Sequence, residues 1–179
     1  MSVITELFVA TEPAARRYHS AWDEEAALGD ADAWYDEAPA EGLPADEVAP
    51  EEPPPTGPLD DARDALVDHD QRQGLFDTHL SALWRVLDGG GGVGRPGAAP
   101  SLEVVPVTGT RLMFRLPVAF TDLLASLRPS DVGGVAREWL AEGGPATDVD
   151  MAVEVVGVLS RMAVRAQRDG LRVFLYLVG

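Results

Sequence analysis

Cysteine and lysine are both absent from this chain of 179 residues. The absence of cysteine excludes disulfide bonds, thiol catalysis and zinc sites built from cysteine. The absence of lysine excludes a lysine Schiff base and a phosphate-binding loop that depends on lysine. All fourteen basic residues are therefore arginine. We interpret this preference as the mark of a GC-rich genome.

Long apolar runs are absent as well. No stretch approaches the roughly 18–20 apolar residues of a membrane span. The opening residues, MSVITELFVATEP, have no basic segment and carry Glu6, which is unlike a secretory signal peptide. Together with the missing cysteine, these features favour the cytoplasm and predict no membrane contact.

Positive charge is scarce in the first part of the chain. The net charge is −16, and residues 1–70 hold nineteen acidic residues against three arginines. Residues 71–179 hold eleven of each and are neutral. Phosphate binding requires clustered positive charge, so nucleic acid is excluded as an expected partner. A concentrated negative charge instead favours a basic protein partner, because long-range attraction speeds association.

Residues 23–58 are rich in aspartate, glutamate, alanine and proline. High charge and few large apolar residues predict a flexible or extended insertion. An aromatic pair within it, Trp34 and Tyr35, suggests a short partner-binding motif. Alternatively, the pair only holds the insertion against the folded body. The candidate partner-binding residues are Asp23, Glu24, Glu25, Trp34, Tyr35, Asp36 and Glu37.

The end of the chain carries the clearest structural pattern. Residues 147–169 have helical periodicity, and Gly170 follows where a left-handed residue ends a helix. The expected inward face is Met151, Val155, Val158, Leu159, Met162 and Ala166. Thr147 and Asp150 resemble a capping box. Residues 172–178 are apolar on both faces, which predicts a central strand covered on both sides.

The remaining patterns predict one α+β domain. Strands are expected at 2–10, 102–107 and 111–116, and helices at 13–22, 59–73, 75–87, 117–127 and from Ser130 to Gly143. Pro106 limits the strand at 102–107 to a short or edge position. The predicted fold is a small mixed β-sheet that includes the N- and C-terminal strands. Amphipathic helices flank it, and the acidic, Pro-rich insertion interrupts it.

Patterns that would carry chemistry are weak. Gly89, Gly91 and Gly94 match a dinucleotide-binding pattern, but a predicted helix precedes them and prolines follow, which indicates a loop. No serine has the context of an acyl-transfer nucleophile. Asp122, Arg137 and Glu138 could line a cleft, although solvent-facing helix positions explain them equally well.

One cluster resembles a set of metal ligands. It comprises Asp68, His69 and Asp70, with Asp77 and His79 beyond. The spacing matches no specific metal motif. His79 lies on an apolar helical stripe, where a core or boundary histidine is the simpler interpretation. We therefore predict no metal and no cofactor, while the four residues at positions 68, 69, 70 and 79 leave the question open.

Three segments together resemble a group of uncharacterised actinobacterial proteins: MSVITELFVATEPAARR, RLPVAFTDLLASL with VAREWLAEGG, and LSRMAVRAQRDGLRVFLYLV. That group is distantly similar to the YfbM-like family, a domain of unknown function. The resemblance covers roughly residues 1–20 and 102–179. It implies a small α/β body with both terminal strands in one sheet, and it brings no catalytic residues. Residues 23–58 depart from the shared pattern in length and acidity.

These observations favour a non-enzymatic protein-binding module over an enzyme. Its acidic segment would engage a basic partner, and an immunity-type or antitoxin-like inhibitor of a basic toxin is the most concrete form. Two alternatives stay open. One is an enzyme or small-ligand-binding protein, which requires a concave pocket with convergent polar groups. The other is a structural subunit whose acidic arm lies along a neighbour.

Overall fold

A computed structural model describes residues 4–32, 57–89, 101–107, 111–145 and 148–178. The chain divides into two compact units. The sheet unit comprises residues 1–12 and 66–179, and the acidic unit comprises residues 13–65.

The sheet unit contains five strands. They are β1 (Ile4–Ala10), β2 (Asp68–Gln73), β3 (Glu103–Val105), β4 (Leu112–Arg115) and β5 (Arg172–Val178). Their order is β2-β1-β5-β4-β3, and every neighbouring pair is antiparallel. The α+β fold and the pairing of the terminal strands are confirmed. The sheet is antiparallel rather than mixed, because strand direction depends on the connections, which hydrophobic periodicity does not report.

Strand β5 occupies the centre of the sheet, as its two apolar faces predicted. Leu175 lies opposite Leu7 of β1 on one side and Phe114 of β4 on the other. All three belong to one buried core. At the far edge, β3 has only three residues and ends immediately before Pro106, which cannot donate a ladder hydrogen bond.

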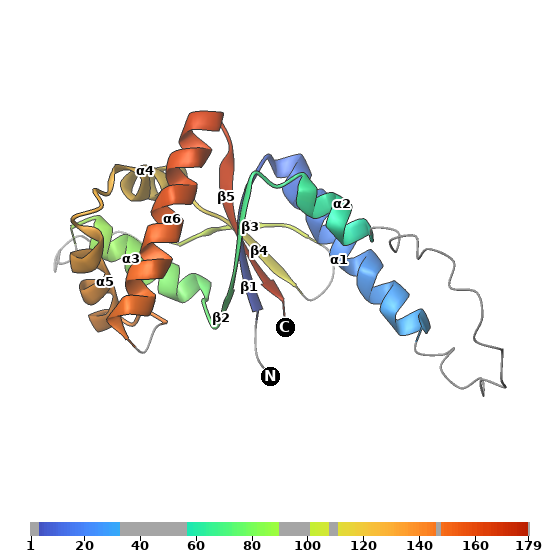
Figure 1. Ribbon diagram of the computed structural model, residues 1–179, viewed down its shortest axis with the longest axis horizontal. Helices are drawn as coiled ribbons and strands as arrows, with labels where there is room; N and C mark the ends of the chain where they lie inside the picture. The colour runs from blue at the N-terminus through green and yellow to red at the C-terminus, as the bar shows by residue number, and fades with distance from the viewer. Residues whose placement is uncertain (1–3, 33–56, 90–100, 108–110, 146–147, 179) are drawn as a thin grey trace, which may run out of the picture. The chain divides into compact units, whose positions relative to one another are not determined.

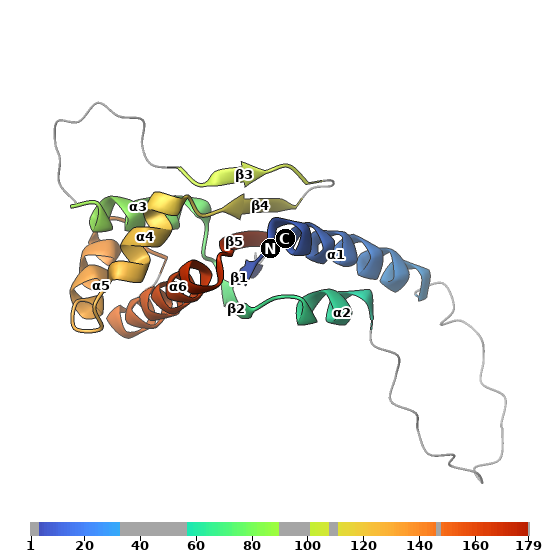
Figure 2. The ribbon, with the colours of Figure 1, turned by 90° about the horizontal axis from the view of Figure 1, so that it is seen from above.

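Four helices of this unit lie together on one side of the sheet (Figures 1 and 2). They are α3 (Asp77–Leu87), α4 (Val118–Ser126), α5 (Val132–Ala141) and α6 (Val149–Asp169). Helix α6 packs against α4, α5, β1 and β5, and its valine-rich face is buried. Helix α5 begins after Asp131 rather than after Ser130.

The start of α6 differs from the expected capping box. The helix is capped by Asp148, whose carboxylate accepts a hydrogen bond from the Met151 amide at 2.8 Å. Thr147 lies outside the described residues. Met151 was expected to face inward, but 47% of its surface is exposed, and the neighbouring Ala152 is the fully buried residue of this turn.

Helix α6 ends as expected at Gly170, which has a φ angle of +67°. Replacing Gly170 by alanine should lower the free energy of unfolding by about 1 kcal/mol, because a Cβ disfavours the left-handed conformation. Gly157 in the middle of α6 provides the matched control, since a Cβ there would meet nothing within 4 Å. Gly157→Ala should stabilise the protein by about 0.5–1 kcal/mol. Thermal unfolding of both variants tests the difference, and shifts of the same sign would contradict the assigned conformations.

The segment from Asp68 to Gln73 was expected to be helical, and this expectation is wrong. Helix α2 (Pro58–Asp64) ends early, and β2 pairs with β1 as an edge strand. The sequence of β2, DHDQRQ, contains no apolar residue, so it carries no hydrophobic alternation to reveal a strand. Pairing with β1 and ion pairs to α6 determine its conformation instead.

The acidic unit contains most of α1 (Glu12–Asp32) and all of α2. Helix α1 was expected to end near Trp22, but it continues for ten residues to Asp32. The start of the insertion is therefore helical rather than extended. This segment, DEEAALGDAD, contains no proline and several strong helix formers. Residues 33–56 of the insertion lie outside the described residues.

Candidate functional site

The cluster that resembled metal ligands is divided between the two faces of β2. Asp68 and Asp70 face α6, because alternate strand residues point to opposite sides. Arg72 pairs with Asp70 at 2.5 Å and with Glu154 of α6 at 2.9 Å. These hydrogen bonds, chiefly the one that Arg72 donates to Asp70, raise the pKa of Arg72 above its ordinary value. The aspartates therefore belong to a charged layer between β2 and α6.

His69 lies on the other face of β2. Its Nε2 atom is 3.7 Å from Oε1 of Glu6, a side chain with no exposed surface. His69 therefore cannot share a metal ion with Asp68 and Asp70, which lie on the opposite face of β2. Within the ranges that the structure describes, no three histidine, aspartate or glutamate side chains are arranged to hold a metal ion.

His79 has a local structural role at the start of α3. Its Nδ1 atom accepts a hydrogen bond from the backbone N–H of Phe76 at 3.1 Å, which satisfies one of the free amide groups at the helix start. The proton of the neutral ring is then on Nε2. Burial lowers the pKa of His79 below its ordinary value, and the charge of Asp77 opposes this effect. His79 is therefore neutral at neutral pH.

This arrangement makes part of the stability depend on pH. A histidine whose pKa is lowered by folding stabilises the native state above its unfolded pKa of about 6.5. That contribution is lost as the pH falls from about 6.5 through the lowered value. We expect His79→Asn, which does not titrate, to remove this part of the pH dependence. Urea unfolding at several pH values tests it, and a stability difference from the wild type that stays constant with pH would contradict it.

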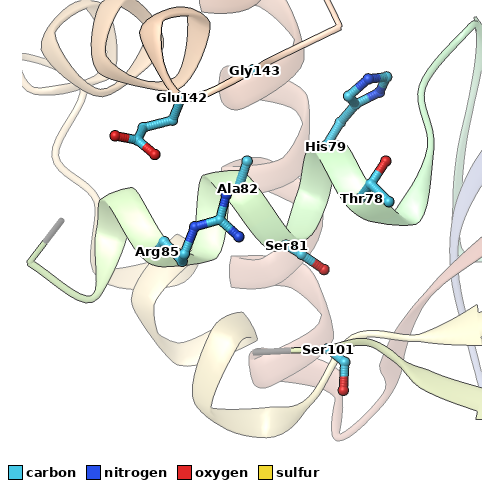
Figure 3. Close-up of a pocket in the computed structure, with 8 residues that line it drawn as sticks. All are labelled: Thr78, His79, Ser81, Ala82, Arg85, Ser101, Glu142 and Gly143. Atoms are coloured by element: carbon cyan, nitrogen blue, oxygen red, sulfur yellow. The ribbon is translucent and has the colours of Figure 1, made fainter. Parts of the chain in front are cut away.

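A hollow lined by both polar and apolar groups lies along the exposed side of α3 (Figure 3). We call it the α3 hollow, and its volume is about 530 Å³. Five of its residues lie on α3. The two residues that follow α5, and Ser101 shortly before β3, complete it. Its lining residues are Thr78, His79, Ser81, Ala82, Arg85, Ser101, Glu142 and Gly143. Its volume is in the range of small-molecule sites.

The walls of the α3 hollow are fixed to each other by Trp139. This fully buried residue of α5 donates its indole N–H to the backbone oxygen of His79 at 2.7 Å. The amide of Gly144 donates to the backbone oxygen of Trp139 at 2.8 Å. Gly143 adopts a φ angle of +97°, and a Cβ on Gly144 would lie 3.1 Å from that same oxygen. The two glycines therefore allow the chain to turn closely over Trp139.

A second hollow lies within the acidic unit. It has a volume of about 370 Å³ and runs between α1 and α2, so we call it the α1–α2 groove. Small side chains form much of it, and charged side chains come from both helices. Its lining residues are Arg17, Ser20, Ala21, Glu24, Pro58, Asp61, Ala62 and Ala65.

The structure brings together part of the predicted partner-binding set. Glu24 lines the α1–α2 groove. Glu25 lies close to Gly57 at the start of α2, where an added Cβ would be 2.9 Å from the carboxylate. Asp23 lies 3.8 Å from Nε2 of His19. The other candidates, Trp34, Tyr35, Asp36 and Glu37, lie outside the described residues.

The remaining candidates do not gather into a site. Asp122 accepts a hydrogen bond from Gln167 of α6 at 2.5 Å, and it lines neither hollow. Arg137 and Glu138 are exposed on α5 and line neither hollow. Most of the glycine-rich segment, residues 90–100, lies outside the described residues.

Sequence reasoning missed the α3 hollow, although a signal was available. Thr78, Ser81 and Arg85 form a polar stripe at helical spacing, opposite the apolar stripe that predicted the helix. The facing residue Glu142 comes from a distant part of the sequence. Only the packing of α5 on α3 brings it to the same place.

Comparison with known protein families, with curated protein sequences and with solved structures finds no match for this chain. The resemblance to the YfbM-like family therefore stays a prediction. None of the helices in the described ranges has the length and apolar character needed to cross a membrane.

Proposed function

We propose that this protein is a non-enzymatic protein-binding module whose acidic unit engages a basic partner. The observation that supports the proposal is that most of the net negative charge lies on one of the two structural units. The acidic unit, residues 13–65, holds fifteen acidic and three basic residues, a net charge of −12. The sheet unit is more than twice as long and has a net charge of −4.

Several acidic side chains of this unit are available to a partner. Glu24 on α1 and Asp60 and Asp61 on α2 are exposed, and none of their carboxylates forms an ion pair or hydrogen bond with another described residue. By contrast, Asp68 and Asp70 of the sheet unit are paired with arginines. Exposed like charges cost stability through repulsion, so their concentration on one unit favours a role in recognition.

The α1–α2 groove supports a specific mode of contact. Alanine and proline side chains provide an apolar surface, and Glu24 and Asp61 add negative charge beside it. An arginine-rich amphipathic helix has the complementary pattern, because its aliphatic arginine stems cover apolar surface while the guanidinium groups reach carboxylates. The charge would attract the partner, and the groove would fix its position.

A charge-removing variant tests the proposal. The triple variant Asp23→Asn, Glu24→Gln, Glu25→Gln neutralises three predicted partner-binding residues on α1. With an arginine-rich amphipathic peptide as the probe, we expect association at about 0.1 M salt to slow about tenfold, because charge steering is lost. Stopped-flow measurement of the association rate on the full chain gives this number.

The matched control removes the same amount of charge from the sheet unit. Asp88, Glu138 and Asp150 are exposed and form no ion pair with any described residue. Their neutralisation should change the association rate much less. Equal slowing by both triple variants, or a rate that does not depend on salt, would refute steering by the acidic unit.

An immunity-type or antitoxin-like inhibitor of a basic toxin is the most concrete form of this proposal. It is supported by the same charge distribution, because the potentials of two binding surfaces are complementary and a basic toxin would meet an acidic surface. This form predicts that the intact chain suppresses such a toxin at an equimolar ratio. The α1 triple variant should require a large excess for the same effect.

A further inference from the structure

We propose that the α3 hollow is a binding site for a polar α-amino acid, with Arg85 holding the carboxylate and Glu142 the ammonium group. This site lies in the sheet unit and is independent of the acidic α1–α2 groove. It assigns a ligand class to a region that the proposed protein-binding role does not use.

The two charges carry the inference. Arg85 of α3 and Glu142 at the end of α5 line the same hollow, and both lie toward the same end of it (Figure 3). They form no salt bridge with each other. Neither side chain makes an ion pair or a hydrogen bond with another described residue. Two opposite charges that share a hollow without pairing are complementary to a ligand that carries both charges on one head group.

The rest of the hollow fits a polar side chain. Thr78 and Ser81 precede Arg85 on α3, and their hydroxyl groups too form no hydrogen bond with a described residue. Thr78 and Arg85 are seven residues apart on the helix, a rise of about 10 Å. A bound amino acid would therefore direct its side chain along α3 towards these hydroxyls. Buried Ala82 provides the apolar floor.

The site is also preorganised. Trp139 fixes α5 to α3 through its hydrogen bond to His79, and the Gly143–Gly144 turn places Glu142 at the edge of the hollow. Binding thus requires no rearrangement of either wall. Preorganised walls reduce the entropy cost of binding a small ligand.

Amide NMR titration of the full chain tests this site. The probes are L-serine, L-threonine, L-asparagine and L-glutamine, with two analogues of glutamine that each lack one charge. 4-Carbamoylbutanoate lacks the ammonium group, and 4-aminobutanamide lacks the carboxylate. We expect at least one amino acid to shift the amide signals of Ser81, Arg85 and Glu142. For a glutamine-type ligand, each analogue should bind about tenfold or more weakly.

Variants identify the residues responsible. Arg85→Gln and Glu142→Gln should each weaken binding about tenfold, and the exchange Arg85→Glu with Glu142→Arg should restore part of it. The control variants Arg137→Gln and Glu138→Gln, on the exposed side of α5, should leave affinity unchanged. No shift with any of the four amino acids would overturn the proposal. So would equal binding of the singly charged analogues, or equal loss in the control variants.

Discussion

Replacement of Trp139 by alanine should lower the free energy of unfolding by about 3–5 kcal/mol. Trp139 is among the largest fully buried side chains, and its indole N–H donates to the backbone oxygen of His79 at 2.7 Å. The substitution removes a large, fully buried side chain of α5 from the core and leaves a cavity there. Urea unfolding followed by circular dichroism gives the stability change.

Trp139→Phe separates packing from hydrogen bonding. Phenylalanine retains most of the ring volume but not the N–H donor, so we expect a loss of only about 1 kcal/mol. If Trp139→Ala loses no more stability than Trp139→Phe, the packing of this side chain does not make the expected contribution to the free energy of unfolding. The phenylalanine variant should also loosen the α3 hollow, since it no longer fixes α5 to α3.

Replacement of Leu175 by alanine should cost about 2–5 kcal/mol. Leu175 is fully buried at the centre of β5, opposite both Leu7 and Phe114. Removing its side chain therefore affects the packing of three adjacent strands. Equilibrium unfolding in urea measures the effect.

Leu177 provides the comparison on the same strand and the same face. It is only partly buried at the edge of the core, so Leu177→Ala should cost clearly less than Leu175→Ala. Similar losses at the two positions would mean that β5 is not packed as a central strand.

The sequence was most informative where burial was complete. The run RVFLYLV predicted a central strand with the correct bounds, because only a strand covered on both faces tolerates apolar side chains on each. The valine and methionine periodicity predicted α6, and Gly170 predicted its end. In each of these cases the local pattern and the tertiary environment require the same conformation.

The sequence was least informative where pairing partners come from distant segments. Strand β2 has no apolar residue, so its conformation depends on β1 and on Arg161 and Glu154 of α6. Once β2 is known to be a strand, alternation alone separates His69 from Asp68 and Asp70.

The candidate sites were likewise predictable in part: the sequence located the charged residues but not the contacts between helices. Charge counting located the acidic part of the chain, and Asp23, Glu24 and Glu25 lie on α1 as exposed or half-exposed residues. Charge counting could not reveal that α1 continues to Asp32 or that α2 forms a groove with it. The α3 hollow required the contact between α5 and α3, which no local pattern encodes.

The most direct measurement of the central claim is hydrogen–deuterium exchange of the full chain with and without the arginine-rich amphipathic peptide. A protein that uses its acidic unit for recognition should gain protection in α1 and α2 at about 0.1 M salt and lose it at about 1 M salt. Protection confined to α6 and β5 would contradict this account. Protection of α1 and α2 that persists unchanged at about 1 M salt would also contradict it.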